Sequence, residues 1–296
     1  MTKPIAVDLG PVQQTLLIPL LGRAEQTRRA QGLIHDPKAV KIVESLDYDF
    51  DKWRGNPSLL GASLRTRMLD EEVEAFLALH PSGTVVEIGC GLNTRFDRVD
   101  NGTVRWVDLD LPDTIALRRR LFEDKERCSV LSTSVLDFDW MDEVARMGGP
   151  WCFISEAALI YLEEPQVRQV VAGLAERFAG AWFITDTVSR TMVDNQHRHD
   201  AMRHLPKDSW FRWVCDDPRS LEGWGPGIHL DRSRTFLDAS PQLQRRLPWG
   251  MRTFLKYAPR FMTRGLRGYR LNRLVLLPPE PLAEEGGDST GERLGE

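Results

Sequence analysis

The stretch "TVVEIGCGLNTR", residues 84–95, decides how this chain is expected to fold. Its first residues are apolar and β-branched, which is typical of a buried strand, and Gly89 and Gly91 follow at once. A strand that runs into a glycine-rich turn begins the ligand site of a doubly wound α/β fold. Because Thr94 stands where a dinucleotide-binding turn has its third glycine, the spacing disfavours a pyrophosphate ligand.

Strand-like and helix-like segments alternate beyond this turn. The strand-like stretches are residues 85–88, 104–107, 129–131, 151–154 and 181–184, and the helical ones are 114–122, 140–146 and 166–178. Two late strands are expected at 235–237 and 269–277, and a long helix at 59–79 leads into the first strand. This order predicts a doubly wound, Rossmann-like α/β sheet whose ligands bind at the carboxyl ends of the strands.

Composition narrows the class of protein. The 296 residues, 42% of them hydrophobic, can bury the core of one large α/β unit, and a net charge of −4 disfavours a surface built for nucleic acid. Four widely spaced cysteines without a Cys-x-x-Cys pair indicate neither a disulfide framework nor a cysteine zinc site. The N-terminus lacks a leader pattern and no apolar run is long enough for a membrane span, so we expect a cytoplasmic protein without membrane contact.

Acidic residues at the strand ends suggest which ligand the glycine turn holds. Glu87 precedes the glycines, and Asp110 lies nineteen residues after Gly91, close to the distance at which an acid meets ribose hydroxyls. These features fit S-adenosylmethionine, which has an ammonium, a sulfonium and a ribose but no phosphate. The alternative is a tight turn with a solvated Glu87. Of Asp108 and Asp110, one is expected only to cap the helix after Pro112.

The third strand is followed by "STSVLDFDW", residues 132–140. Ser134 and Val135, beside Asp137, are candidates for contact with an adenine edge. An N-cap before Trp140 explains the same spacing equally well.

Several stretches together resemble the leucine carboxyl methyltransferase superfamily, and more closely its bacterial branch of tetracenomycin-type polyketide carboxyl O-methyltransferases. They are "PLLGRAEQTRR", "GLIHDPKAVKIVESLDYDFDK", "LRTRMLDE", "VVEIGCGLNTRF", "WVDLDLP", "SVLDFDW", "ISEAALIYL" and "DDPRSLEGWGPG", spread from Pro19 to Gly227. The resemblance implies an N-terminal helical cap at 1–80, a methyltransferase domain at 81–277 with a C-terminal lid or insertion, and S-adenosylmethionine as cofactor.

The resemblance also implies residue roles. A basic residue of the N-terminal helices and an arginine of the helix before the first strand hold the methionine carboxylate in that family, and they match Arg23 and Arg65, with Arg67 as competitor for the second role. A guanidinium suits this task because it binds a carboxylate bidentately and stays charged when buried. For Arg23 the alternative is a solvated helix face. The remaining matches are Gly89 for the first glycine, Asp110 for the ribose, Ser134 and Val135 for the adenine, and Glu156 near the ammonium.

Candidates for contact with the methyl acceptor follow the fourth and fifth strands. In "DNQHRHDAMRH" His197 and His204 share a helical face, whereas His199 lies off it, so the first two are candidate bases or polar lining. Their spacing matches no common helix zinc pattern, and we expect no metal. Tyr161 in "ALIYL" either touches substrate or packs in the core.

The C-terminal part has two charge blocks. Residues 232–273 contain eleven basic residues and one acid, Asp238, which suits a solvated face or a lid for an acidic substrate better than a membrane-surface helix. The polar, acidic tail at 278–296 is expected to be disordered.

Three functions remain open. The favoured one is an O-methyltransferase that esterifies a carboxylate of a small, polyketide-like natural product. The second is a phenolic O-methyltransferase, which would need a base because a phenol has a pKa near 10. The third is a non-catalytic descendant that binds the cofactor or a protein partner.

Overall fold

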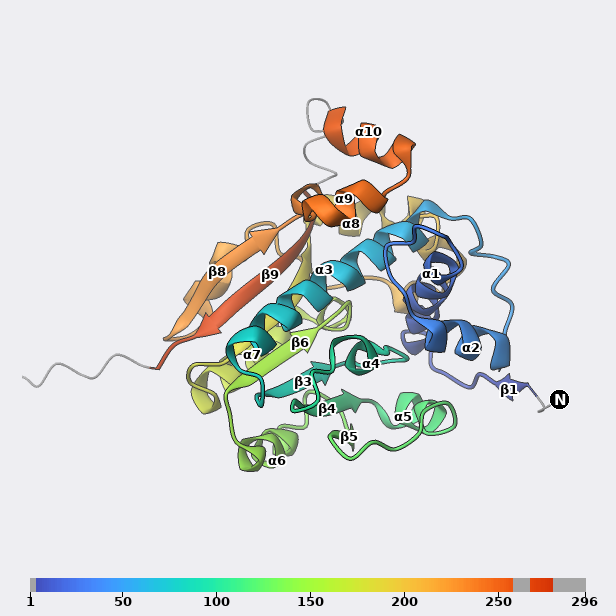
Figure 1. Ribbon diagram of the computed structural model, residues 1–296. Coiled ribbons are helices and arrows are strands. Elements are labelled where there is room, and N and C mark those ends of the chain that lie inside the picture. Colours follow the sequence, from blue (N-terminus) through green and yellow to red (C-terminus); the bar gives the residue numbers. More distant parts are fainter. Residues whose placement is uncertain (1–3, 258–266, 279–296) are drawn as a thin grey trace, which may run out of the picture.

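A seven-stranded sheet forms the centre of the computed structural model, which describes residues 4–257 and 267–278. The strands follow the order β5-β4-β3-β6-β7-β9-β8 (Figure 1). Their bounds are Thr84–Ile88 for β3, Arg105–Asp110 for β4, Cys128–Ser132 for β5, Trp151–Ser155 for β6, Trp182–Val188 for β7, Ile228–Arg234 for β8 and Tyr269–Leu276 for β9. Strands β3 to β7 pair in parallel, and β9 runs antiparallel to both neighbours. The predicted doubly wound α/β sheet is confirmed.

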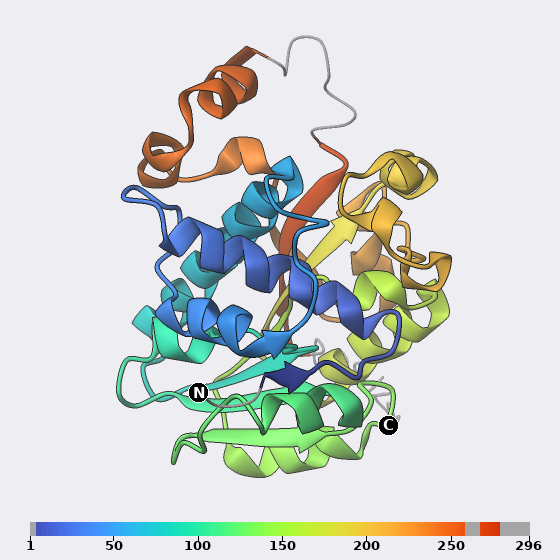
Figure 2. The same ribbon diagram turned by 90° about the vertical axis from the view of Figure 1, so that its right-hand side faces the viewer.

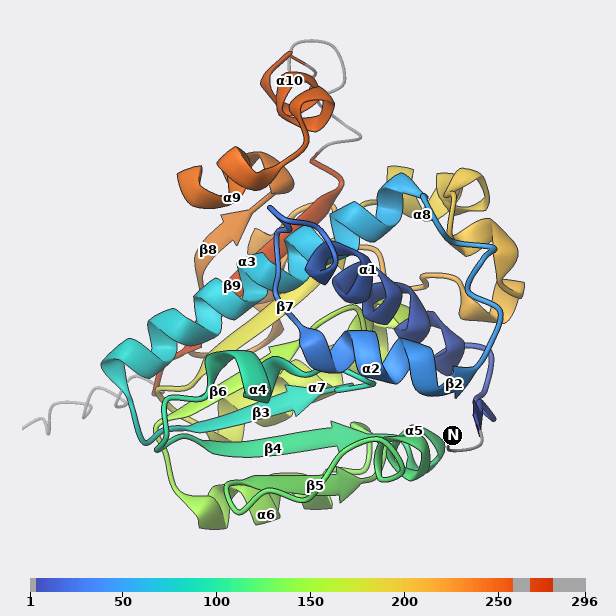
Figure 3. The ribbon, with the colours of Figure 1, turned by 45° about the vertical axis from the view of Figure 1, so that its right-hand side comes forward.

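Helices cover both faces of the sheet, which is why every residue of β3 is buried. The long helix α3 (Pro57–Leu79) packs with α4 (Arg95–Val99) on one face (Figure 3). On the other face α6 (Asp139–Met147) packs with α7 (Glu164–Arg177), while α5 (Pro112–Arg118) follows β4. Helix α7 begins with a capping box between Glu163 and Gln166.

The N-terminal residues form a helical layer over the carboxyl ends of the strands. It comprises a short parallel strand pair, β1 (Ile5–Ala6) with β2 (Leu46–Asp47), the 3₁₀ helix η1 (Gln13–Leu16), α1 (Leu17–Thr27) and α2 (Pro37–Ser45). The Asp36 carboxylate caps α2 by accepting the N–H of Ala39 at 2.9 Å, as the Asp-Pro pair predicts. Figure 2 shows α1 passing in front of the sheet when the molecule is viewed from this side.

Short helices dominate the region after β7. They are α8 (Arg190–Asn195), η3 (Gln196–Arg198), η4 (Met202–His204), η5 (Lys207–Ser209), η6 (Pro218–Trp224), η7 (Phe236–Asp238), α9 (Pro241–Arg246) and α10 (Trp249–Tyr257). A further 3₁₀ turn, η2 (Leu159–Tyr161), follows β6. In Figure 1, α9 and α10 lie at the top of the molecule, away from the parallel strands.

The prediction of a strand at 235–237 is wrong. Thr235 begins the 3₁₀ helix η7 because its backbone N–H donates to the Asp238 carboxylate at 2.7 Å and its Oγ1 accepts the N–H of Leu237 at 3.3 Å. The neighbouring strand of the sheet is β8, which precedes Thr235. Its sequence, IHLDRSR, is largely polar because β8 is an edge strand whose side chains are mostly in contact with solvent.

Parts of two predictions lie outside the described residues. These are the tail after residue 278 and, within the basic segment, Arg260 and Arg264. None of the helices in the described part of the chain combines the length and the apolar character that crossing a membrane requires.

Candidate active site

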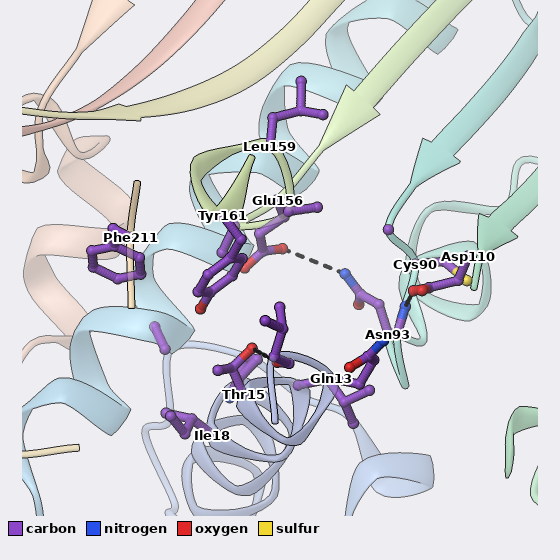
Figure 4. A pocket seen from close by; sticks show the side chains of 18 of the residues that line it. Gln13, Thr15, Ile18, Cys90, Asn93, Asp110, Glu156, Leu159, Tyr161 and Phe211 are labelled. Atoms are coloured by element: carbon purple, nitrogen blue, oxygen red, sulfur yellow. Dashed lines mark hydrogen bonds between the residues drawn. The ribbon is translucent and has the colours of Figure 1, made fainter. Parts of the chain in front are cut away.

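A cavity of about 690 Å³ opens at the carboxyl ends of β3, β4, β5 and β6, where the ends of these strands meet the N-terminal helices. The chain leaves β3 toward β4 on one side, and β6 lies on the other, so this is the topological switch point at which doubly wound sheets bind ligands. The volume lies in the range of small-molecule sites. Figure 4 shows Tyr161 and Phe211 on one side of this cavity, Cys90 and Asp110 on the other, and Glu156 between them.

The glycine turn forms one wall of the cavity with its amides already occupied. Gly89 and Gly91 have φ values of 69° and 50°, in the left-handed region that favours glycine. The N–H groups of Gly89 and Cys90 both donate to the carbonyl of Leu109, at 2.8 and 3.1 Å, and that of Gly91 donates to Asp110 Oδ2 at 2.7 Å. A pyrophosphate cradle needs such amides free. The turn therefore suits a ligand without phosphates at this position.

Asp110 lies at the end of β4 and lines the cavity. Its Oδ1 accepts the N–H of Leu111 at 2.7 Å, so each carboxylate oxygen is fixed by one amide and keeps a lone pair for a ligand hydroxyl. Asp108 is buried instead. It forms an ion pair with Arg118 and accepts the indole N–H of Trp106 at 2.9 Å, so neither acid caps the following helix through its side chain.

The segment after β5 contributes Ser134 and Val135 to the cavity lining. The alternative, an N-cap before Trp140, is wrong. Helix α6 has Phe138 at its N-cap position without a side-chain cap, and the Asp137 carboxylate accepts the hydroxyl of Thr133 at 3.0 Å.

Arg65 and Glu156 face each other across the centre of the cavity lining. Arg65 Nε donates to Glu156 Oε1 at 2.9 Å, and its Nη1 donates to the hydroxyl of Tyr269 at 3.0 Å. Thr66 Oγ1 and Arg95 also donate to this carboxylate. Although burial opposes ionisation, the two guanidinium groups lower the pKa of Glu156 to about 2. Glu156 is thus a fixed negative charge and a very weak base.

Glu87 does not line the cavity, which corrects the expectation that it faces the ligand. Its side chain is 1% exposed, lies beneath the glycine turn, and accepts from Asn93 Nδ2 at 2.7 Å and from Arg95. Burial, with a smaller contribution from the neighbouring Asp108, raises the pKa of Glu87 to about 7 against the attraction of Arg95. Its role in this structure is to hold Asn93 and Arg95, not to meet a ligand.

Arg23 also lines the cavity. The alternative interpretation, that Arg23 lies on a solvated face of its helix, is therefore wrong. The Arg23 side chain is 2% exposed. Its Nε donates a hydrogen bond to the Asp36 carboxylate at 2.9 Å, and its Nη2 donates to the carbonyl of Leu92 at 2.8 Å. Arg67, the competitor of Arg65, lies outside the cavity and pairs with both carboxylate oxygens of Glu74 at 2.9 and 3.0 Å. Two arginines from separate helices therefore reach the cavity, and Arg67 is not one of them.

The other half of the cavity is aromatic and apolar. Tyr161 packs against Phe211 with ring centroids 5.5 Å apart, and Met192, Met202 and Phe236 line the same half. Burial raises the pKa of Tyr161 to about 12. Tyr161 therefore contacts both the cavity and the core, and its phenol stays protonated.

The two histidines predicted to be site residues are exposed and do not line the cavity. His197 lies against the carbonyl of Asp194 at 3.2 Å, and His204 accepts from Arg203 at 3.2 Å. The segment forms separate 3₁₀ turns instead of one helix, so the assumed helical face does not exist. His199, which that periodicity excluded, lines the cavity.

Sequence reasoning also missed the buried residues that support the cavity. Arg95 is 0% exposed and bridges Asp70, Glu87 and Glu156. Asn93 donates to Glu87 and, at 3.4 Å, to Glu156 (Figure 4). Both lie in the opening stretch at 84–95. One signal for Asn93 and Arg95 was available in the sequence, namely that polar residues directly follow a buried strand and its glycine turn. Their partners Asp70 and Glu156 could not be identified in this way, because they are distant in the sequence.

Comparison with known proteins places this arrangement in a family. The model of the leucine carboxyl methyltransferase family matches residues 17–175, more than half of the chain. The chain belongs to the leucine carboxyl methyltransferase family. It is a methyltransferase that depends on S-adenosylmethionine, and it falls in the bacterial branch that resembles tetracenomycin O-methyltransferase.

Three relatives of this methyltransferase illustrate the match. The tetracenomycin polyketide synthesis O-methyltransferase TcmP of Streptomyces glaucescens is 31% identical over 266 residues, which cover 86% of this chain and 97% of that protein. The S-adenosyl-L-methionine-dependent methyltransferase dpfgK of Gibberella zeae is 25% identical, covering 78% and 84% of the two chains. The crystal structure of a duf574 family protein from Streptomyces avermitilis, 15% identical, covers 77% of this methyltransferase and 88% of its own chain with a TM-score of 0.52, which shows the fold alone.

Proposed function

We propose that this methyltransferase transfers a methyl group to a carboxylate oxygen of a small, polyketide-like acid and so forms a methyl ester. The relative TcmP is named as an O-methyltransferase of polyketide synthesis, and it matches this chain over most of both lengths. The acceptor half of the cavity, with Tyr161, Phe211 and two methionines, suits an aromatic or otherwise apolar body.

The residues around the cavity fit S-adenosylmethionine. We propose that Asp110 binds the ribose hydroxyls and that Ser134 and Val135 meet the adenine. Gly89 lets the turn pack closely against the segment after β6, because a Cβ at Gly89 would lie 2.3 Å from that of Ala158. We propose that Gly89 and Gly91 also let the backbone approach the cofactor. Arg23 and Arg65 would hold the methionine carboxylate, and Glu156, a permanent anion among cations, would meet the ammonium.

When bound, this cofactor supplies an electrophilic methyl group on a sulfonium, whose sulfur takes the bonding electron pair as the acceptor oxygen bonds to the methyl carbon. The protein has to align the acceptor and exclude water. The aromatic walls of the cavity help to exclude water. Arg212, which follows Phe211 in the cavity lining and lies 3.5 Å from Glu163, is half exposed and would offer a positive charge to an acidic acceptor.

The observation that favours a carboxylate over a phenol is that Glu156 and Tyr161, two prominent polar groups of the cavity lining, do not act as bases near neutral pH. Glu156 has a pKa of about 2 and Tyr161 one of about 12, so neither takes a proton from a phenol near neutral pH. A carboxylate needs no base, because it is ionised above about pH 5.

A transfer assay with matched acceptors tests this proposal. Labelled S-adenosylmethionine is offered with flat aromatic acids of one to four rings, such as 2-naphthoic acid, and with the corresponding phenols, such as 2-naphthol. We expect label in the acids only, released as methanol by mild alkali because an ester hydrolyses and an aryl ether does not. The rate should stay nearly flat above about pH 6.

Label in alkali-stable phenol ethers would replace the proposal with the phenolic activity. Cofactor binding in calorimetry without transfer to any acid or phenol of the panel would favour the non-catalytic descendant.

A further inference from the structure

His199 lies in the cavity lining close to Met202, which packs in one apolar cluster with Tyr161 and Phe211 of the acceptor half. It lies between η3 and η4, is partly buried, and lines the cavity with Met192 and Met202. The adjoining residue anchors the segment to the start of α3: Asp200 Oδ2 accepts the N–H of Ser58 at 3.1 Å, and the Asp200 carbonyl accepts from Asn56 Nδ2 at 3.3 Å. The imidazole is therefore presented by an anchored segment.

The backbone around His199 determines which ring nitrogen carries the proton. Nδ1 lies 3.3 Å from the N–H nitrogen of Ala201 and 3.4 Å from that of Met202, and both groups are donors, although the Ala201 N–H also donates to Asp200 Oδ1 at 2.9 Å. Asp200 Oδ1 lies 3.4 Å from Nδ1 as well, and it already accepts this N–H. The two backbone donors favour a lone pair on Nδ1, so that the hydrogen of a neutral ring lies on Nε2. Burial and the charge of Arg65 lower the pKa of His199 against the opposing carboxylate of Asp200, which favours the neutral ring.

A neutral imidazole in this tautomer is a hydrogen-bond donor at Nε2 and has no lone pair there. It cannot accept a proton at that atom, so it does not act as the base that a phenol would require. A carboxylate oxygen, by contrast, is a strong acceptor for such an N–H.

We propose that His199 binds the methyl acceptor by donating Nε2–H to its carboxylate, and that it contributes in this way to selection of acids over phenols. This assignment rests on the proposed function. It makes His199 an acceptor-binding residue with no part in proton transfer.

Two substitutions separate the ring's two roles. His199→Asn keeps an acceptor near the position of Nδ1 and removes the donor at Nε2, whereas His199→Gln can place an amide N–H close to the Nε2 position. The control is His197→Asn, on the same segment but exposed and outside the cavity.

With 2-naphthoic acid or the best acid of the panel, His199→Asn should raise KM about tenfold or more, the size expected for a hydrogen bond to a charged group. His199→Gln should recover most of this loss, and His197→Asn should match the wild type. The affinity for S-adenosylmethionine and the thermal transition should stay unchanged in all three variants. Between pH 6.5 and 9 the profile of kcat/KM of His199→Asn should run parallel to that of the wild type.

Three results would overturn the assignment. The first is an unchanged KM in folded His199→Asn, and the second is a KM of His199→Gln as high as that of His199→Asn. The third is a pH-dependent part of the wild-type kcat/KM profile that disappears when His199 is replaced, which would indicate a base. A wild type that methylates phenols and not acids would overturn the proposed function itself, whereas activity on acids with any of the three results overturns only the role of His199.

Discussion

Arg65 and Glu156, ninety-one residues apart in the sequence, are joined by a hydrogen bond of 2.9 Å from Nε to Oε1. Arg65 comes from the middle of α3 and Glu156 from the turn after β6, so the contact links the helical layer to the switch point of the sheet. Both side chains line the cavity and are largely buried, with 11% and 6% of their surface exposed. Because both groups are largely buried, removal of either charge would leave the other without full compensation in the protein interior.

Replacement of Arg65 should weaken cofactor binding. Arg65→Ala removes one of two proposed ligands of the methionine carboxylate, and we expect a loss of about 2 to 5 kcal/mol in the binding free energy of S-adenosylmethionine, measured by calorimetry. Arg65→Lys keeps the charge but not the planar fork and should be impaired as well. Because Glu156 loses a partner, the thermal transition has to confirm folding first.

Arg67→Ala is the matched control for this prediction. Arg67 pairs with Glu74 outside the cavity, and its removal should cost at most about 1 kcal/mol of stability, as for other surface pairs. Normal cofactor affinity in both variants would refute the proposed role of Arg65, and a loss in Arg67→Ala alone would transfer that role to Arg67.

Asp110→Asn should lower the affinity for S-adenosylmethionine by about 1.5 to 3 kcal/mol, the range for hydrogen bonds to a charged group. The amide removes the charge and turns one oxygen into a donor, which then opposes the N–H of Gly91 or Leu111. Asp113→Asn, in the next turn but outside the cavity lining, is the control. Equal affinities of the two variants in calorimetry would argue against a ribose contact at Asp110.

Gly89→Ala should destabilise the fold by about 2 to 4 kcal/mol, the sum of overpacking and a left-handed backbone for a residue with a Cβ. The new Cβ would lie 2.3 Å from that of Ala158 in the turn after Glu156. Gly102→Ala separates the two costs, because Gly102 has φ of 85° and nothing within 4 Å of the added Cβ. It should lose only about 1 kcal/mol in denaturant unfolding. Similar losses in both would show that the contact with Ala158 is unimportant.

Glu87→Gln should become more favourable relative to wild type as pH rises. The folded pKa of about 7 lies above the unfolded value near 4.3, so between these values the unfolded state loses a proton that the folded state keeps. The wild type therefore loses stability as pH rises from about 4 to 7, and glutamine, which does not titrate, avoids this loss.

Denaturant unfolding at pH 5 and pH 8 measures this effect. We expect the difference in unfolding free energy between Glu87→Gln and wild type to shift toward the variant by about 1 to 3 kcal/mol. A difference that is constant across this interval would mean that Glu87 is ionised in the folded protein, with Arg95 outweighing the cost of burial.

The local pattern of residues was enough to predict the five parallel strands and β9, but not the polar edge strand β8. Alternating apolar stretches and helical periods determine the order of strands and helices, because each element must bury its own apolar face. Gly89, Gly91, Asp110, Ser134 and Val135 line the cavity, since strand ends in a parallel sheet meet at one edge, and their contacts with the cofactor stay predictions. Arg23, Arg65 and Glu156 depended on the family resemblance.

Tertiary structure decided which of the neighbouring polar residues face the cavity. Glu87 and Asp108 are partners in the register of β3 and β4, one or two residues before the strands end, and both are buried. Asp110 points to the same face of β4 as Asp108 but lies at the strand end, where the cavity begins, and side-chain alternation does not distinguish them. His199 replaced His197 and His204 because the chain turns repeatedly there, and those turns are set by hydrogen bonds to distant residues such as Asn56 and Ser58.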